Sequence, residues 1–192
     1  MNAFKNQCVS MTWRLLRFSC LASAAVVVIV LCAWAGYHVV VGADPLIVRL
    51  FGIRDDVELI RTAEMVEAFR IRGDMQRKPP PQGVRHIHGH TILAGPVVVD
   101  AETRRALAET LTSAWTYWWI GGKPCLPQPG LAFRFTKGNR VTEILICFEC
   151  DELIVLSPEH GERYEDFDYG RDELVRIAKR LFPADDIIQS LD

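Results

Sequence analysis

Three cysteines in the C-terminal half of the chain are the residues best suited to carry chemistry. Cys147 and Cys150 are separated by two residues, and Cys125 lies upstream of them. Cysteines in such a set serve as a redox pair, as zinc ligands, or as a structural disulfide with one thiol left over. The spacing alone does not select which two of the three would pair.

The surroundings of Cys147 and Cys150 favour a disulfide over the other two uses. Redox pairs of the thioredoxin type begin a helix, whose dipole lowers the thiol pKa, whereas this pair lies between the strand-like runs EILIC and ELIVL. A zinc site needs a fourth ligand beside the three cysteines; the candidates are His86, His88, His90 and His160. We expect a structural disulfide, with an envelope thiol-redox or zinc-binding protein as the alternative.

Three of the histidines lie in one short run, at positions 86, 88 and 90. The alternation over 84–93 predicts a strand, which would place the three imidazoles on one face, about 6.5–7 Å apart. That spacing suits one side of a metal site, but no acidic cluster adjoins the run. We interpret the run as an exposed polar face opposite a buried Ile87.

Catalytic motifs are absent from the sequence. It contains no G-x-G-x-x-G, Walker loop, G-x-S-x-G or H-E-x-x-H pattern. An aromatic cluster at the end of an apolar helical stripe is expected to pack in the core and not to form a ligand platform; it comprises Trp115, Tyr117, Trp118 and Trp119. We therefore assign no catalytic residue and no cofactor, and favour a non-enzymatic domain.

The elements that would position these residues follow from apolar periodicity. Strands are predicted at 64–72, 84–93, 131–135, 141–148 and 152–156. A helix is predicted over 101–118, with Asp100 as its N-cap and Gly121-Gly122 as its end. The polar stretch 159–170 is expected to be a surface loop, and a last helix begins near Arg171. Strands linked as hairpins and followed by helices indicate an α+β fold, an antiparallel sheet with packed helices on one face.

An uncharged apolar run precedes this domain. Residues 18–43 contain no charged side chain, and a helix of about 20 residues crosses a bilayer core. Lys5, Arg14 and Arg17 precede the run, which places the N-terminus in the cytoplasm. We expect a cytoplasmic segment 1–17, a transmembrane helix 18–43 and an extracytoplasmic domain 44–192. The competing interpretation is a signal peptide cleaved near the small residues of Ala33-Trp34-Ala35.

Composition narrows the classes of partner. Hydrophobic residues make up 49% of the chain, too many for a disordered protein. The net charge of −2 gives no basic face for nucleic acid. The expected partners are the lipid bilayer and another envelope protein that the domain binds as an interaction module.

The C-terminal half resembles a family of uncharacterised bacterial membrane-anchored or exported proteins with a C…PG…F-R-F…ICFxC…LFP layout. The matching segments are Cys125, Pro129-Gly130, Ala132-Phe133-Arg134-Phe135, Ile144-Leu145-Ile146-Cys147-Phe148-Glu149-Cys150 and Leu181-Phe182-Pro183. The resemblance covers roughly 115–191, and the spacing of its cysteines is its most specific part. It implies that the three cysteines act as a set, and it implies no activity.

Overall fold

The computed structural model describes residues 26–33, 43–73 and 83–192. The chain divides into two compact units, Met1–Gly42 and Ala43–Asp192. In the first unit, residues 26–33 are helical with exposed side chains. Within the described ranges, no helix has both the length and the apolar character that a membrane crossing requires. Most of the expected span 18–43 lies outside the described residues, as does the expected cytoplasmic segment 1–17.

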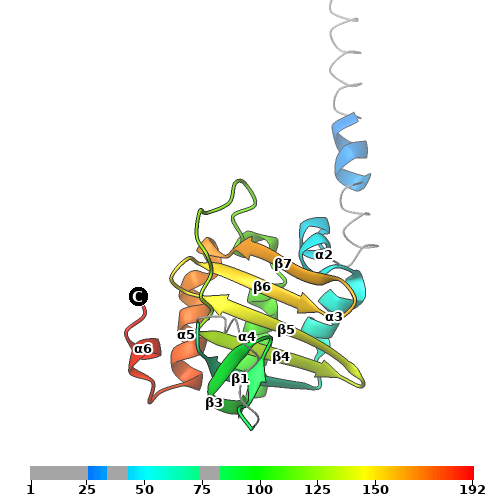
Figure 1. The fold of residues 1–192 in the computed structure, drawn as a ribbon. Coiled ribbons are helices and arrows are strands. Elements are labelled where there is room, and N and C mark those ends of the chain that lie inside the picture. The colour runs from blue at the N-terminus through cyan, green and yellow to red at the C-terminus, as the bar shows by residue number, and fades with distance from the viewer. Residues whose placement is uncertain (1–25, 34–42, 74–82) are drawn as a thin grey trace, which may run out of the picture. The chain divides into compact units, whose positions relative to one another are not determined.

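The second unit is an α+β domain with an antiparallel sheet, as predicted, and the sheet has seven strands where five strand segments were expected (Figure 1). Its strands are β1 (Met65–Ile71), β2 (His86–Ile87), β3 (His90–Val98), β4 (Leu131–Lys137), β5 (Arg140–Cys147), β6 (Glu152–Ser157) and β7 (Gly161–Asp166). They pair in the order β2-β3-β1-β4-β5-β6-β7. From β4 onward each strand pairs with the next along the chain, so short turns fix the register.

The helices pack on one face of this sheet (Figure 1). They are α2 (Pro45–Phe51), α3 (Arg54–Thr62), α4 (Ala101–Leu111), α5 (Arg171–Leu181) and the short α6 (Asp186–Gln189), with 3-10 turns η1 (Ala114–Thr116) and η2 (Asp168–Gly170). Asp44 and Asp100 cap α2 and α4 by accepting backbone N–H groups. The predicted stripe on α5, from Leu174 to Leu181, is buried.

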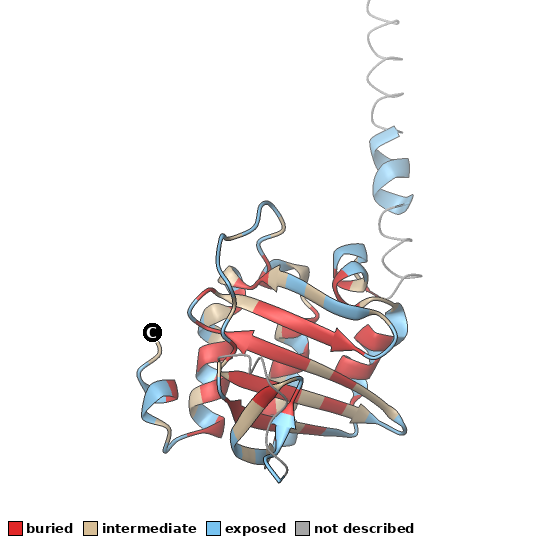
Figure 2. Ribbon diagram, viewed as in Figure 1, coloured by how far each residue is buried: buried red, intermediate tan, exposed pale blue. Residues whose placement is uncertain are grey.

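Apolar side chains on the two faces of the sheet form two separate cores. Figure 2 shows that the central strands are largely buried. Alternate residues of the strands, such as Phe133, Phe135, Ile144 and Ile146, face the helices in the larger core. The smaller core on the other face contains Phe69, Ile71, Ile87, Ala132, Leu145, Ile154 and Leu156. Burial on both faces explains why β5 and β6 are nearly continuous apolar runs.

The histidine run forms a hairpin and not the single strand predicted over 84–93. β2 and β3 are joined by His88 and Gly89, whose φ values of 44° and 80° belong to a tight turn. The turn breaks the alternation, so His86 is exposed while His90 is buried. The expectation that three imidazoles share one face is therefore wrong.

The turn of this hairpin contacts β7, the strand at the opposite edge of the sheet. A ring nitrogen of His88 lies 2.7 Å from a carboxylate oxygen of Glu162 on β7. The Tyr164 hydroxyl donates to the same carboxylate at 2.6 Å. Hydrogen bonds from Tyr164 and then from His88 lower the pKa of Glu162, against a smaller effect of burial. Because β2 and β7 are the two edge strands, this contact means that the sheet curls on itself.

Two further predicted boundaries differ from the structure. The helix expected over 101–118 ends at Leu111, and Thr112 caps it. The backbone N–H of Trp118 donates to the carbonyl of Asp166 on β7, which requires an extended chain there. The expected loop over 159–170 instead contains β7, whose residues are mostly polar because it is an edge strand.

Candidate interaction surface

A long connection between α4 and β4 carries the cysteine set. We call residues 112–130 the stapled loop. Apart from η1, the loop contains neither helix nor strand. Connections of this length without regular structure are uncommon in compact domains, and those that are ordered commonly carry function.

Three contacts hold the loop against the sheet. Cys125 forms a disulfide with Cys150 in the β5–β6 turn, and their Cα atoms are 6.3 Å apart. The Lys123 ammonium donates to both carboxylate oxygens of Asp168, at 2.8 and 2.9 Å, and to the carbonyl oxygen of Cys150 at 2.9 Å. The Trp118 N–H donates to Asp166 at 2.8 Å. The loop is thus tied covalently, electrostatically and through its backbone.

Inward side chains fix the start of the loop. Tyr117 is buried, and its hydroxyl donates to the carbonyl of Leu111 at 2.7 Å. Burial, and then the charge of Glu165, raises the pKa of Tyr117 far above its usual range. Trp119 packs 5.1 Å from the Tyr117 ring and donates its indole N–H to Ala114. Core packing is therefore correct for these two members of the aromatic cluster.

Other apolar side chains of the same region face solvent. Trp115, Ile120 and Leu126 are 89%, 82% and 84% exposed. Trp118 is also exposed, and its ring lies 5.8 Å from the ring of exposed Tyr169 in η2. We call these five residues, four from the loop and Tyr169 from the neighbouring η2, the apolar surface of the loop. Figure 2 shows the loop largely in the exposed colour. The prediction that Trp115 and Trp118 pack in the core is wrong, because the helix ends before it reaches them.

Carboxylates gather beneath the loop. Glu152 on β6 lies opposite Asp166 on β7 in the sheet register. Burial and then the charge of Asp166 raise the pKa of Glu152, and burial likewise raises the pKa of Asp166. Burial lowers the pKa of Lys123, but the contact with Asp168 and the neighbouring carboxylates raise it more, so the net shift is upward. Lys123 is therefore one cation that offsets these carboxylates, and Arg171, which pairs with Asp151, is another.

The structure brings two of the three predicted cysteines together. Cys147 stays free and buried on β5, and its sulfur accepts the backbone N–H of Gln128 at 3.3 Å. Sulfurs joined in a disulfide offer no thiolates, so Cys125 and Cys150 are no zinc ligands in this state. Within the described part of the chain, no three His, Cys, Asp or Glu side chains are grouped to hold a metal ion.

His160, the remaining ligand candidate, belongs to a different cluster. Its ring nitrogen Nε2 lies 3.8 Å from a carboxylate oxygen of Asp56. Asp56 is buried, with Arg140 at 2.7 Å and the Ser157 hydroxyl at 3.3 Å. Because the serine bonds the aspartate and not the histidine, the three do not form a nucleophile–base arrangement. This cluster ties α3 to β5 and β6.

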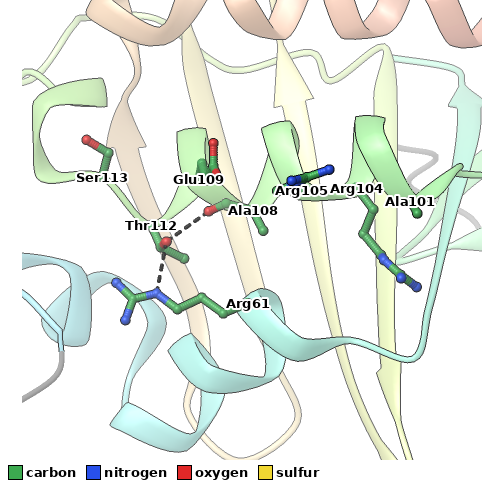
Figure 3. A pocket seen from close by; sticks show the side chains of 8 residues that line it. All are labelled: Arg61, Ala101, Arg104, Arg105, Ala108, Glu109, Thr112 and Ser113. Atoms are coloured by element: carbon green, nitrogen blue, oxygen red, sulfur yellow. Dashed lines mark hydrogen bonds between the residues drawn. The ribbon is translucent and has the colours of Figure 1, made fainter.

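A hollow between α3 and α4 is also lined by polar groups (Figure 3). Its volume is about 580 Å³, and three arginines border it. Arg61 donates from Nε to the hydroxyl of Thr112 at 3.1 Å, and Arg104 donates to the carbonyl of Glu64 at 2.8 Å. Figure 3 shows Arg61, Arg104 and Arg105 pointing in different directions. The guanidinium groups do not converge, so no anion site is assigned.

Sequence reasoning missed several residues of the loop's surface. Ile120, Leu126 and Tyr169 were not singled out, and neither was Lys123. A usable signal is present in the segment IGGKPCLPQPG, where large apolar residues stand among glycines and prolines without any period. Apolar residues in such a segment have no helix or strand face to bury them.

Comparison with known proteins gives no relative for this chain. It matches no family model, no curated protein and no solved structure.

Proposed function

We propose that the chain is a single-pass membrane protein whose extracytoplasmic domain, residues 44–192, is a non-enzymatic binding module of the cell envelope. The transmembrane helix is residues 18–43, and the apolar surface of the stapled loop is the contact surface. The partner is an apolar component of the envelope.

The compartment is supported by two independent observations. The uncharged run of 26 residues exceeds the length of about 20 that a bilayer core needs. A disulfide between Cys125 and Cys150 persists in an oxidising compartment and is rare in the cytosol. Both favour a domain outside the cytoplasmic membrane.

The observation that carries the binding role is the combination of exposure and fixation in one loop. Trp115, Ile120 and Leu126 each leave more than four-fifths of their surface in solvent. A flexible loop could fold such residues back, but the disulfide and the Lys123 contacts oppose this. Fixing a loop before binding lowers the ordering entropy lost in the complex. Large apolar side chains held outward are typical of contact surfaces.

Site-specific photo-crosslinking in the full-length protein tests this function. A benzophenone amino acid replaces Leu126 in intact membranes, and a matched control replaces Val98, which is 69% exposed on β3. We expect adducts, with protein or lipid, at position 126 and not at 98, and we expect Cys125→Ser to reduce them. Equal labelling at both positions would contradict the proposal.

A second candidate function is thiol–disulfide chemistry, and one contact favours it. The buried thiol of Cys147 accepts a hydrogen bond from the backbone N–H of Gln128. Cys147 also lies three residues before Cys150, whose disulfide partner Cys125 is exposed. Equilibration of the protein in glutathione buffers separates the two functions. A structural disulfide has a reduction potential below about −300 mV, whereas a catalytic one lies well above it. We expect the lower value.

A further inference from the structure

We propose that the contact between His88 and Glu162 is a pH-sensitive clasp, which holds the β2–β3 hairpin tightly against β7 in mild acid and loosens as the pH rises. The clasp comprises His88, Glu162 and Tyr164. It goes beyond the proposed function, because it lies on the face of the sheet that carries the smaller core and does not involve the stapled loop.

The clasp joins the two edge strands of the sheet across that face. Glu162 lies opposite Leu156 in the register of β6 and β7, and Leu156 belongs to the smaller core. Side chains directly opposite each other in an antiparallel pair project from the same face. Nε2 of His88 reaches Oε1 of Glu162 from the hairpin, at 2.7 Å. The contact therefore closes the curl of the sheet.

The turn that carries His88 does not itself require a histidine. His88 and Gly89 are the two central residues of the hairpin turn, with φ values of 44° and 80°. A two-residue turn with both φ angles positive favours Asn-Gly, because asparagine tolerates this conformation well. Asparagine would keep the turn, but its shorter side chain would not reach Glu162. His88→Asn therefore removes the clasp and leaves the turn in place.

His88 is the group of the clasp that changes charge near neutral pH. The lowered pKa of Glu162 keeps its carboxylate ionised. The hydrogen bond to Glu162, then burial and the charges of Glu162 and Glu152, raise the pKa of Tyr164 to about 12, so its hydroxyl remains a donor. The imidazole of histidine changes charge between about pH 5 and pH 8. Its protonation turns a neutral hydrogen bond into an ion pair with a carboxylate that is already charged.

Charged groups on the neighbouring strands are paired or project elsewhere. Glu143 on β5 lines the same hollow as His88, but a guanidinium nitrogen of Arg134 lies 2.7 Å from its carboxylate. On β7, Arg163 and Glu165 lie opposite residues of the larger core, so they project from the face that the helices cover. The clasp therefore depends mainly on the charge of its own histidine.

The other histidines and the cation of the hairpin have different partners. The exposed His86 has a ring nitrogen 3.4 Å from a backbone carbonyl, and the buried His90 has one at 2.9 Å from another. His160 faces Asp56 on α3. Arg85 donates to a backbone carbonyl of β3 at 2.9 Å. None of these contacts includes the carboxylate of the clasp.

Loosening of the clasp gives access to the space beneath the hairpin. Both ion-pair partners line a hollow of about 440 Å³, together with the apolar side chains of Val141, Leu156 and Pro158. Ile87, the residue before His88, is buried in the smaller core. Movement of the hairpin away from β7 removes one wall of the hollow and uncovers Ile87. The clasp thus couples proton concentration to exposure of the smaller core.

Hydrogen exchange in the full-length protein in detergent micelles tests the clasp. The reporter is the backbone N–H of Ile92, which donates to the carbonyl of Arg85 at 3.0 Å and so closes the hairpin. Its protection, corrected for intrinsic exchange, is measured at about pH 5.5 and about pH 8 in the wild type and in His88→Asn. The ratio of the two protections should be about two- to fivefold higher in acid, the range of an exposed ion pair. The turn preference of asparagine is the same at both pH values and cancels.

Two variants and a second reporter make the result specific. Glu162→Gln should remove the same pH dependence, and adding His88→Asn to it should remove no more. His86→Asn, which replaces an exposed histidine on the adjacent strand, should keep the pH dependence of the wild type. The backbone N–H of Val99, which donates to Val66 at 2.9 Å, should respond equally in wild type and variants.

Three outcomes would overturn the clasp. The first is an equal ratio of protections at the two pH values. The second is loss of the pH dependence in His86→Asn. The third is a parallel change at Val99, which would assign the effect to the stability of the whole domain. The proposed function is tested separately by crosslinking from position 126, so either result can fail without the other.

Discussion

Removal of the Cys125–Cys150 disulfide should destabilise the domain by an amount that its position in the chain determines. The linked residues are 25 apart in sequence. The loop-closure entropy that such a link removes from the unfolded chain corresponds to about 3.5 kcal/mol at room temperature. Greater freedom of the loop in the folded state without the link lowers the loss, so Cys125→Ala should reduce the free energy of unfolding by about 2–3.5 kcal/mol.

Urea denaturation with and without reductant measures this loss. Reductant should destabilise the wild type by a similar amount and leave Cys125→Ala unchanged, because that variant has no bond to reduce. Cys147→Ala is the matched control, since it removes a buried sulfur that is free in the structure. It should cost about 1 kcal/mol for the lost packing and keep the response to reductant.

Two results would refute this reasoning. If Cys147→Ala abolished the response to reductant, Cys147 would be a disulfide partner and the pairing would be wrong. If Cys125→Ala and the wild type had the same stability, the loop would not be held covalently. Disulfide mapping by mass spectrometry of the same samples decides between these two explanations.

Three further perturbations test other parts of the structure. Arg140→Met leaves the buried Asp56 carboxylate without its 2.7 Å partner and should cost about 2 kcal/mol in urea denaturation, whereas Arg176→Met on the surface should cost less than about 0.5 kcal/mol. Burial raises the pKa of Asp166 in the folded state, so the folded protein binds this proton more tightly than the unfolded chain, and this group's contribution to stability grows as pH falls through the raised pKa; relative to the wild type, Asp166→Asn should therefore lose urea midpoint on acidification, because it lacks this contribution while Glu162 and Glu173, whose pKa values are lowered, act in the opposite direction in both proteins. Trp115→Ser should change the unfolding free energy by less than about 0.5 kcal/mol, because the side chain is 89% exposed, while it lowers crosslinking from position 126; a large loss of stability would mean that Trp115 packs in the core.

The parts of the fold that sequence could predict are those with a periodic buried face. β4, β5, β6 and α5 place apolar residues at the spacing of their own secondary structure, so their positions follow from the pattern. β7 has the sequence GERYED and pairs with β6 along one side only. Because few of its side chains are buried, its sequence lacks the alternating apolar residues that predict a strand. The turn between β2 and β3 requires positive φ angles at His88 and Gly89. The glycine was the feature of the sequence that could have predicted this turn.

The candidate surface was predictable in its cysteines but not in its geometry. The sequence predicted that two of the three cysteines Cys125, Cys147 and Cys150 would form a disulfide, whereas the choice of the two depends on how the loop crosses the β5–β6 turn. The spacing of Leu111, Trp115 and Trp118 continues a helical stripe, which is why core packing was expected. The backbone bond from Trp118 to β7 is a tertiary contact, and it overrides that local period.

The two edge strands of the curled sheet also influence whether copies of the protein self-associate at high local concentration. Crowded molecules meet often, and an unpaired edge strand is a template for fibril-like pairing between neighbours. One margin here, β2, has only two residues. The other, β7, carries four ionic side chains among its six residues and has α2 packed beside it. Crowded copies of this chain are therefore protected from strand-to-strand self-association by the architecture of the sheet itself.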